Sequence, residues 1–253
     1  MDILRRRYRF RPSVAERYLR LVTELADPLR LDDGVKAQIA QAVYDCVRYQ
    51  GVDYEQRYVR LVKATYARDS SAGGYGVTRA VIWNLRQVML IKDEVFVAEL
   101  LTSEEKRRRD EKRYRVDSAR GDRLAYRHLN RPEFTVLGQT IRFRITTRPW
   151  MLSIVKRFRF LRRLLPDWHK KERDFRDWYV HLVERFVSRT PAIDRVSYDA
   201  WVRALSLADE ARGFREVRYP KMEKVRQQVD EVLKEIESRR SGPVPASLGA
   251  LVP

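Results

Sequence analysis

The most apolar part of the chain is residues 77–101, where hydrophobic side chains recur at helical spacing. Side chains three or four residues apart define one face, and valines seven residues apart define a second: Ile82, Leu85, Met89, Phe96 and Leu100, and Val81, Val88 and Val95. A helix that is apolar on two faces is usually buried. The pattern therefore predicts one long helix through the middle of the protein, with a short polar step at Lys92-Asp93-Glu94.

The same spacing predicts further helices on both sides of this segment. Polar residues such as Ser13 and Ser197 stand where a helix N-cap is expected, and Asp27-Pro28 ends the first helix. The expected helices cover approximately residues 14–25, 35–49, 54–65, 105–115, 151–165, 175–186, 197–207 and 222–236.

Between residues 124 and 147 the pattern changes from helical spacing to strict alternation. In the stretch 140–147, TIRFRITT, hydrophobic side chains alternate with arginines, which is typical of a half-buried strand. Residues 134–137 provide a partner strand, and Gly138-Gln139 provides a hairpin turn. The predicted fold is mainly α: a multi-helix domain with a small two- or three-stranded antiparallel β element.

The predicted organisation is one domain with a short segment at each end. Residues 1–12 form a basic N-terminal arm, and residues 13–237 form a single helical domain with the small β insertion near 124–147. Residues 238–253 are rich in Ser, Gly, Pro and small apolar residues, so we expect a disordered tail. No uncharged run is long enough to span a bilayer and no apolar leader begins the chain, so we expect a cytoplasmic protein.

Four short motifs in register resemble the indolepyruvate ferredoxin oxidoreductase family. Leu90 to Leu100 resembles its hydrophobic-Lys-Asp-Glu-x-x-Val-Ala-x-Leu signature, and residues 48–58 resemble its Tyr-Gln-Asp-x-x-Tyr stretch. Residues 148–152 resemble its Gly-Pro-Trp-Met-Leu turn, and residues 211–218 its Ile-Arg-Gly-Phe-Gly-His-Val-Lys, with Arg148 and Arg215 in place of glycines. The resemblance is to a helical accessory domain of unassigned function, and it implies structural roles for Lys92, Asp93, Glu94, Pro149, Trp150, Gly213 and Phe214.

The resemblance implies an accessory chain without cofactors of its own. In that family thiamine diphosphate sits on a Gly-Asp-Gly motif, and electrons leave through iron–sulfur clusters held by four cysteines each. This chain has one cysteine, Cys46, and no Gly-Asp-Gly, and its glycine cluster at 72–76 lacks the spacing of a phosphate loop. The implied function is a subunit that is not catalytic alone, docked on thiamine-diphosphate and iron–sulfur partner chains that oxidatively decarboxylate an arylpyruvate to an acyl-CoA.

The positive charge of the chain supports the main alternatives to this interpretation. The formal net charge is +18, and residues 134–166 contain no acidic residue. The acid-free stretch could dock an acidic partner subunit or electron carrier, bind nucleic acid, or lie on an anionic membrane. The alternative function is a basic helical nucleic-acid-binding protein. The candidate docking residues are Arg142, Arg144, Arg148, Lys156, Arg157, Arg159, Arg162 and Arg163, and we expect Arg157, Arg159 and Arg162 to face solvent.

No catalytic or metal site is predicted. The three histidines, His128, His169 and His181, lack ligand spacing with cysteine, and each is interpreted as a packing or surface residue. Asp93 and Glu94 are adjacent, so on a helix they point about 100° apart and do not form an acid–base pair. Their expected role is local pairing where the helix meets solvent. Two further side chains are predicted to have structural roles. Trp150 is expected to cover a strand–helix junction, and Cys46 is expected to be a buried hydrophobic residue.

Overall fold

The computed structural model describes residues 12–130, 133–136, 139–142, 145–165, 167–188 and 194–241, and it confirms a mainly α fold. The helices of the N-terminal half are α2 (Pro12–Ala26), α3 (Asp33–Tyr49), α4 (Val52–Arg68), α5 (Gly76–Met89), α6 (Glu94–Leu101) and α7 (Glu104–Arg113). The helices of the C-terminal half are α8 (Pro149–Val155), α9 (Leu161–Leu164), α10 (Lys170–Ser188), α11 (Arg195–Ser206) and α12 (Arg218–Ser241).

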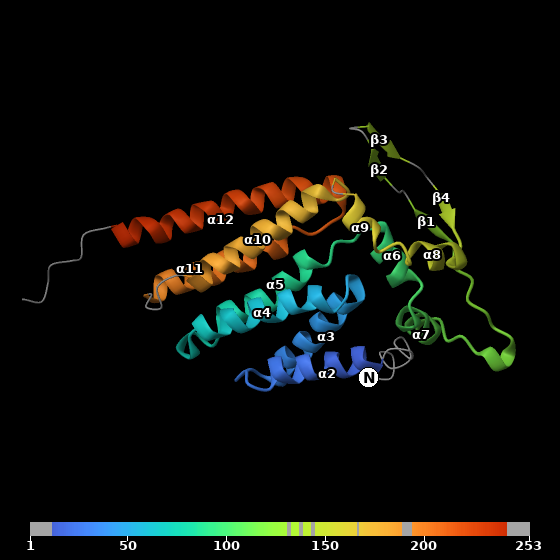
Figure 1. Cartoon of the computed structure of the whole chain (residues 1–253), viewed down its shortest axis with the longest axis horizontal. Coiled ribbons are helices and arrows are strands. Elements are labelled where there is room, and N and C mark those ends of the chain that lie inside the picture. The colour runs from blue at the N-terminus through green and yellow to red at the C-terminus, as the bar shows by residue number, and fades with distance from the viewer. Residues whose placement is uncertain are drawn as a thin grey trace, which may run out of the picture.

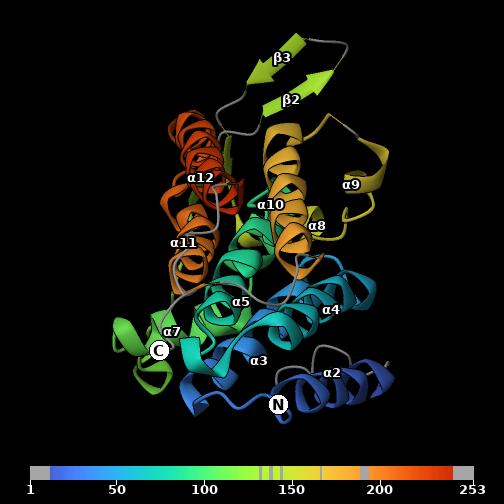
Figure 2. The same ribbon diagram turned by 90° about the vertical axis from the view of Figure 1, so that its left-hand side faces the viewer.

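Helix α5 lies at the centre of the helical body. It packs against α3 and α4 on one side and against α10 and α11 on the other, while α12 covers α11. Figures 1 and 2 show these two groups of helices with α5 between them. Val81 and Leu85 on α5 are completely buried. The prediction that this apolar segment runs through the middle of the protein is therefore confirmed. Cys46 is also buried in this core, and burial raises the pKa of its thiol.

The prediction of one continuous helix over 77–101 is wrong. Helix α5 ends at Met89, and α6 begins at Glu94 with Asp93 as its N-cap. The Asp93 carboxylate accepts a hydrogen bond from the Phe96 amide at 2.7 Å, which satisfies a donor that the helix start leaves unpaired. The Tyr54 hydroxyl donates to the Met89 carbonyl at 2.7 Å, so an orphan acceptor at the end of α5 is satisfied as well. The polar step at 92–94 is a joint between two helices.

The β element consists of two antiparallel pairs. β2 (Glu133–Val136) pairs with β3 (Gln139–Arg142), as the predicted hairpin requires, and β1 (His128–Asn130) pairs with β4 (Ile145–Thr147). β3 and β4 together cover the predicted strand over 140–147 except residues 143 and 144, which lie outside the described residues, and the two pairs share one antiparallel register. Both pairs lie beyond α6 and α8, away from the central helices (Figure 1).

Two helices and the glycine cluster are also compared with the sequence predictions. Helix α12 continues to Ser241, past the predicted domain end at 237. The predicted helix over 151–165 is two short helices, α8 and α9, separated by residues 156–160. The glycine cluster at 72–76 is a turn before α5, as predicted. The basic arm up to residue 11 and the tail from 242 lie outside the described residues, and among the residues described no helix is long and apolar enough to cross a membrane.

Candidate functional site

Helices α8 and α9 and the turn between them carry a group of exposed hydrophobic side chains. α8 packs against α6, and Leu152 is its buried residue. The larger side chains of the segment are instead exposed by 39–65%: Trp150, Ile154, Phe158, Phe160 and Leu164. Together with the exposed cations of residues 148–163, they form what we call the basic–aromatic face. Large exposed apolar patches are typical of interaction sites, and within this group the Phe158 and Phe160 rings are in contact, with centroids 5.8 Å apart.

Trp150 does not have the buried position that the sequence suggested. Its side chain is 62% exposed, so the prediction of a structural anchor is wrong. The reason lies in where α8 begins: Pro149 occupies the first turn, and Leu152, 5% exposed, is the side chain that this helix buries. The Trp150 ring is therefore available to a partner.

Four of the candidate docking cations remain available on this face. Arg148, Arg157 and Arg163 are exposed and Lys156 is half-buried, and none of them forms an ion pair within the described part of the chain. Arg159 lies 3.7 Å from the Glu99 carboxylate, so its charge is partly used internally. The Arg142 side chain and Arg144 lie outside what the structure describes.

Arg162 is buried, and the prediction that it faces solvent is wrong. Its side chain is 7% exposed, and Nε and Nη2 donate to the two oxygens of Asp93 at 2.6 and 2.9 Å. Nη1 donates to the Tyr49 carbonyl, and the guanidinium lies 4.1 Å from the centre of the Tyr49 ring. Bidentate pairing to a buried carboxylate is the geometry that the guanidinium favours. Arg162 therefore fastens the α8–α9 segment to the joint between α5 and α6.

Glu94 makes a second set of long-range contacts at the same joint. It pairs with Arg215, and it lies 3.0 Å from Nε2 of His169. Nδ1 of His169 lies 3.4 Å from Glu172, which accepts a hydrogen bond from the Tyr219 hydroxyl at 3.1 Å. Burial alone would lower the pKa of His169, but the hydrogen bonds to Glu172 and Glu94 outweigh it and raise the pKa to about 9. His169 is therefore a buried cation at neutral pH.

The expected local pairing of Asp93 and Glu94 near solvent is therefore wrong. Asp93 is 2% exposed, and its partner Arg162 is far away in the sequence. Asp93 is the N-cap of α6 and Glu94 its first residue, and the two carboxylates have different partners. Lys92, the first residue of the polar step, is exposed to solvent.

Two residues of this buried cluster have strained backbones. His169 and Arg215, which both contact Glu94, have φ angles of 55° and 46°. A residue other than glycine in the left-handed region costs on the order of 1–3 kcal/mol and persists where its surroundings fix it. Gly213 has φ 132°, a conformation that requires glycine, and the neighbouring Phe214 side chain is 51% exposed. The turn at 213–215 is thus held in one conformation against α6.

The sequence did not point to His169, Glu172, Arg173 or Arg176 as members of this cluster. The sequence feature that could have indicated it is the mixture of acidic and basic residues in 167–177, around the start of the apolar face of the predicted helix. In the described residues no three histidine, cysteine, aspartate or glutamate side chains are placed to hold a metal ion.

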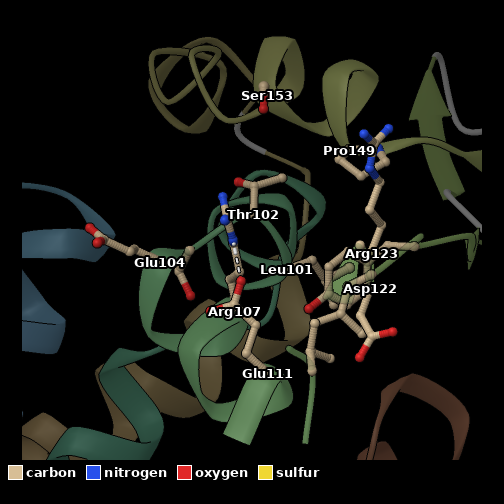
Figure 3. Close-up of a pocket in the computed structure, with 14 residues that line it drawn as sticks. Leu101, Thr102, Glu104, Arg107, Glu111, Asp122, Arg123, Pro149 and Ser153 are labelled. Atoms are coloured by element: carbon tan, nitrogen blue, oxygen red, sulfur yellow. Dashed lines mark hydrogen bonds and ion pairs between the residues drawn. The ribbon is translucent and has the colours of Figure 1, made fainter. Parts of the chain in front are cut away.

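A hollow beside α8 has a volume of about 690 Å³ and is shown in Figure 3. It is bounded by α7 and by the loop that carries Asp122 and Arg123, and α8 contributes Pro149 and Ser153. Its charges are of both signs, and Arg107 is paired with Glu111 at 2.8 Å. This mixed lining gives the hollow no preference for a ligand of one charge.

The described residues define a mainly α-helical protein in which an exposed basic–aromatic face is fastened to a joint of buried ion pairs. Residues 35–231 match the model of a family described as "Family of unknown function (DUF6537)". Because the match covers more than half of the chain, the protein belongs to this family. No curated protein and no solved structure gives a match.

Proposed function

We propose that this chain is a non-catalytic subunit or accessory domain of an indolepyruvate or other 2-oxoacid:ferredoxin oxidoreductase. The basic–aromatic face docks it onto an acidic surface of the catalytic chains. Those partner chains hold thiamine diphosphate and the iron–sulfur clusters, and they carry out the oxidative decarboxylation to an acyl-CoA.

The observation that carries the proposal is the composition of the exposed face. Trp150, Arg157 and Phe158 are all exposed on the α8–α9 segment, and tryptophan, other aromatics and arginine are enriched at the energetic centres of protein interfaces. Ile154 and Leu164 are also exposed, and aliphatic side chains offer nothing on which a nucleobase stacks. The available cations form no ion pair among the described residues, so we infer that the complementary surface is acidic.

The placement of the four motifs supports reading them as parts of one domain. Tyr49 from the first motif, Asp93 and Glu94 from the second, and Arg215 from the fourth meet at the joint between α5 and α6, while the third forms α8, which packs on α6. Arg215 has a left-handed φ, the conformation that glycine favours, where the resembled motif has glycine. All four motifs fall inside the range that matches the family model.

The test is a competition among three classes of partner. Fluorescently labelled protein is titrated with duplex DNA, single-stranded RNA and the acidic catalytic subunits of a cognate 2-oxoacid oxidoreductase, at about 150 mM salt, near physiological ionic strength. The docking variant is Arg157→Glu with Arg163→Glu. The matched control is Arg30→Glu with Arg60→Glu, which changes the net charge equally at two exposed positions, one between α2 and α3 and one on α4.

We expect the subunits to bind, the docking variant to bind at least about tenfold more weakly, a loss of about 1.4 kcal/mol, and the control variant to bind as the wild type does. Equal weakening by both variants would mean that net charge alone matters, which contradicts a defined face. Nanomolar binding of nucleic acid with no binding of the subunits would replace the proposal with the nucleic-acid alternative.

A further inference from the structure

A small cavity lies at the joint, between the end of α3, the residues before α6 and the start of α10. Its volume is about 170 Å³, and its lining combines four cationic side chains with a single carboxylate: Arg162, Arg173, Arg176 and His169, and Asp93. This lining differs from that of the larger hollow in Figure 3, where charges of both signs are mixed.

The positive character persists when the surrounding carboxylates are included. Glu94 and Glu172 pair with His169, and Asp177 pairs with Arg176. Glu94 and Asp177 each contact a further arginine, Arg215 and Arg57. The whole group therefore contains more cations than carboxylates. In addition, the 19-residue helix α10 begins at Lys170, directly beside the cavity, and a helix N-terminus adds a positive potential.

Trp168, which lines the cavity, has a buried donor without an acceptor. Its side chain is 8% exposed, and its indole Nε1 has no hydrogen-bond partner in the described part of the chain. A buried N–H without a partner destabilises the protein, and an acceptor brought by a ligand would remove this destabilisation. The strained backbone of the adjacent His169 is a second feature that concentrates at ligand sites.

We propose that this cavity binds a small oxyanion, namely inorganic phosphate or the carboxylate of a small organic acid. Pockets for larger organic ligands have volumes of about 300–1,000 Å³, so this cavity is too small for a nucleotide or thiamine diphosphate. One water in the liquid occupies about 30 Å³, so the space holds a group of roughly five or six heavy atoms. The ligand lies among the guanidiniums and accepts a hydrogen bond from Trp168. This site does not depend on the docking function, because Arg157 and Arg163 do not line it.

The test is isothermal titration of the full chain with two separate probes, inorganic phosphate and pyruvate, at constant ionic strength. Arg176→Met removes a lining charge; Tyr54 still donates to the Met89 carbonyl, and Asp177 keeps Arg57. Trp168→Phe removes only the indole N–H and keeps an aromatic ring. Arg57→Met is the matched control, because Arg57 pairs with the same carboxylate, Asp177, but does not line the cavity.

We expect saturable one-site binding of at least one probe. Arg176→Met should weaken it at least about tenfold and Trp168→Phe several-fold, while Arg57→Met stays within about twofold, because a screened charge outside the site matters little. Binding of phosphate alone assigns inorganic phosphate as the ligand, and binding of pyruvate alone assigns a small carboxylate. The proposal is overturned if neither probe binds saturably, or if Trp168→Phe and Arg176→Met, folded by circular dichroism, bind as the wild type does.

Discussion

Replacing Arg162 by methionine tests whether the joint depends on its buried ion pair. Arg162→Met keeps an unbranched apolar stem but removes the guanidinium, so the Asp93 side chain, 3% exposed, keeps as donors in the described residues only the Phe96 amide and the Tyr49 hydroxyl, 3.3 Å away. The Tyr49 carbonyl loses its arginine donor as well. Removing one partner of a buried pair costs about 3–5 kcal/mol. We expect the free energy of unfolding to fall by that amount.

The measurement is urea denaturation followed by far-ultraviolet circular dichroism. The matched control is Arg157→Met, an identical change five residues earlier at an exposed position without an internal ion pair, which should change the unfolding free energy by at most about 0.5 kcal/mol. Asp93→Asn combined with Arg162→Met removes both charges and keeps a side chain that can cap α6. The double variant should lose less stability than the sum of the two single changes. If Arg162→Met is as stable as Arg157→Met, the pair does not hold the joint.

Three further changes test other parts of the description. His169 has a pKa of about 9 in the folded protein against about 6.5 when unfolded, so its stabilisation is complete below pH 6.5 and is lost as the pH rises through 9. Urea denaturation at several pH values should show this loss, and His169→Gln should remove it. Trp150→Ala should change the unfolding free energy by less than about 1 kcal/mol, since a ring exposed by 62% forfeits little, whereas a loss of about 3–5 kcal/mol would indicate a buried ring. Gly73→Ala places a Cβ atom 2.3 Å from the Tyr198 ring and should destabilise by about 1–3 kcal/mol, with an unchanged urea midpoint as the contradicting result.

Sequence periodicity predicted those helices whose formation depends on local signals. The expected helix over 35–49 is observed as Asp33–Tyr49, with Asp32 as its N-cap, and the expected helix over 175–186 lies inside Lys170–Ser188. In both, one apolar face and a polar remainder recur at 3.6 residues, and burial of that face follows from the sequence alone. The hairpin at 134–142 was likewise predictable from alternation and its central glycine.

The breaks within helices were harder to predict because two local signals compete there. At 90–93 the hydrophobic faces continue across the polar step, so periodicity alone favours one helix. Asp93 followed by Glu94 is equally a helix start, and the structure follows this second signal. The expected helix over 151–165 breaks at 156–160, and Arg162, which follows the break, pairs with Asp93, a long-range contact that periodicity does not register.

The partners in the candidate site could not be predicted from one sequence. Asp93 pairs with Arg162, and Glu94 with Arg215, over separations of 69 and 121 residues. In the sequence, Arg162 is one of several arginines in a basic stretch, and nothing in its immediate neighbours distinguishes it from Arg157 or Arg163. Only the fold determines which arginine is used internally and which remains available to a partner.

This division of the arginines gives the polar step a specific role in the domain. A buried ion pair is weak evidence for stability, because desolvation offsets much of its attraction, yet a buried charge tolerates few alternative arrangements. Asp93 pairs with Arg162, and Glu94 pairs with Arg215 and His169. These pairs hold the α8–α9 segment and the turn at 213–215 each in one position against α6. An apolar joint would permit the segment to slide. The charged joint instead fixes the position of the basic–aromatic face relative to the helical core. If this face docks a partner, as we propose, the fixed position presents Trp150 and the available arginines to that partner in one constant arrangement.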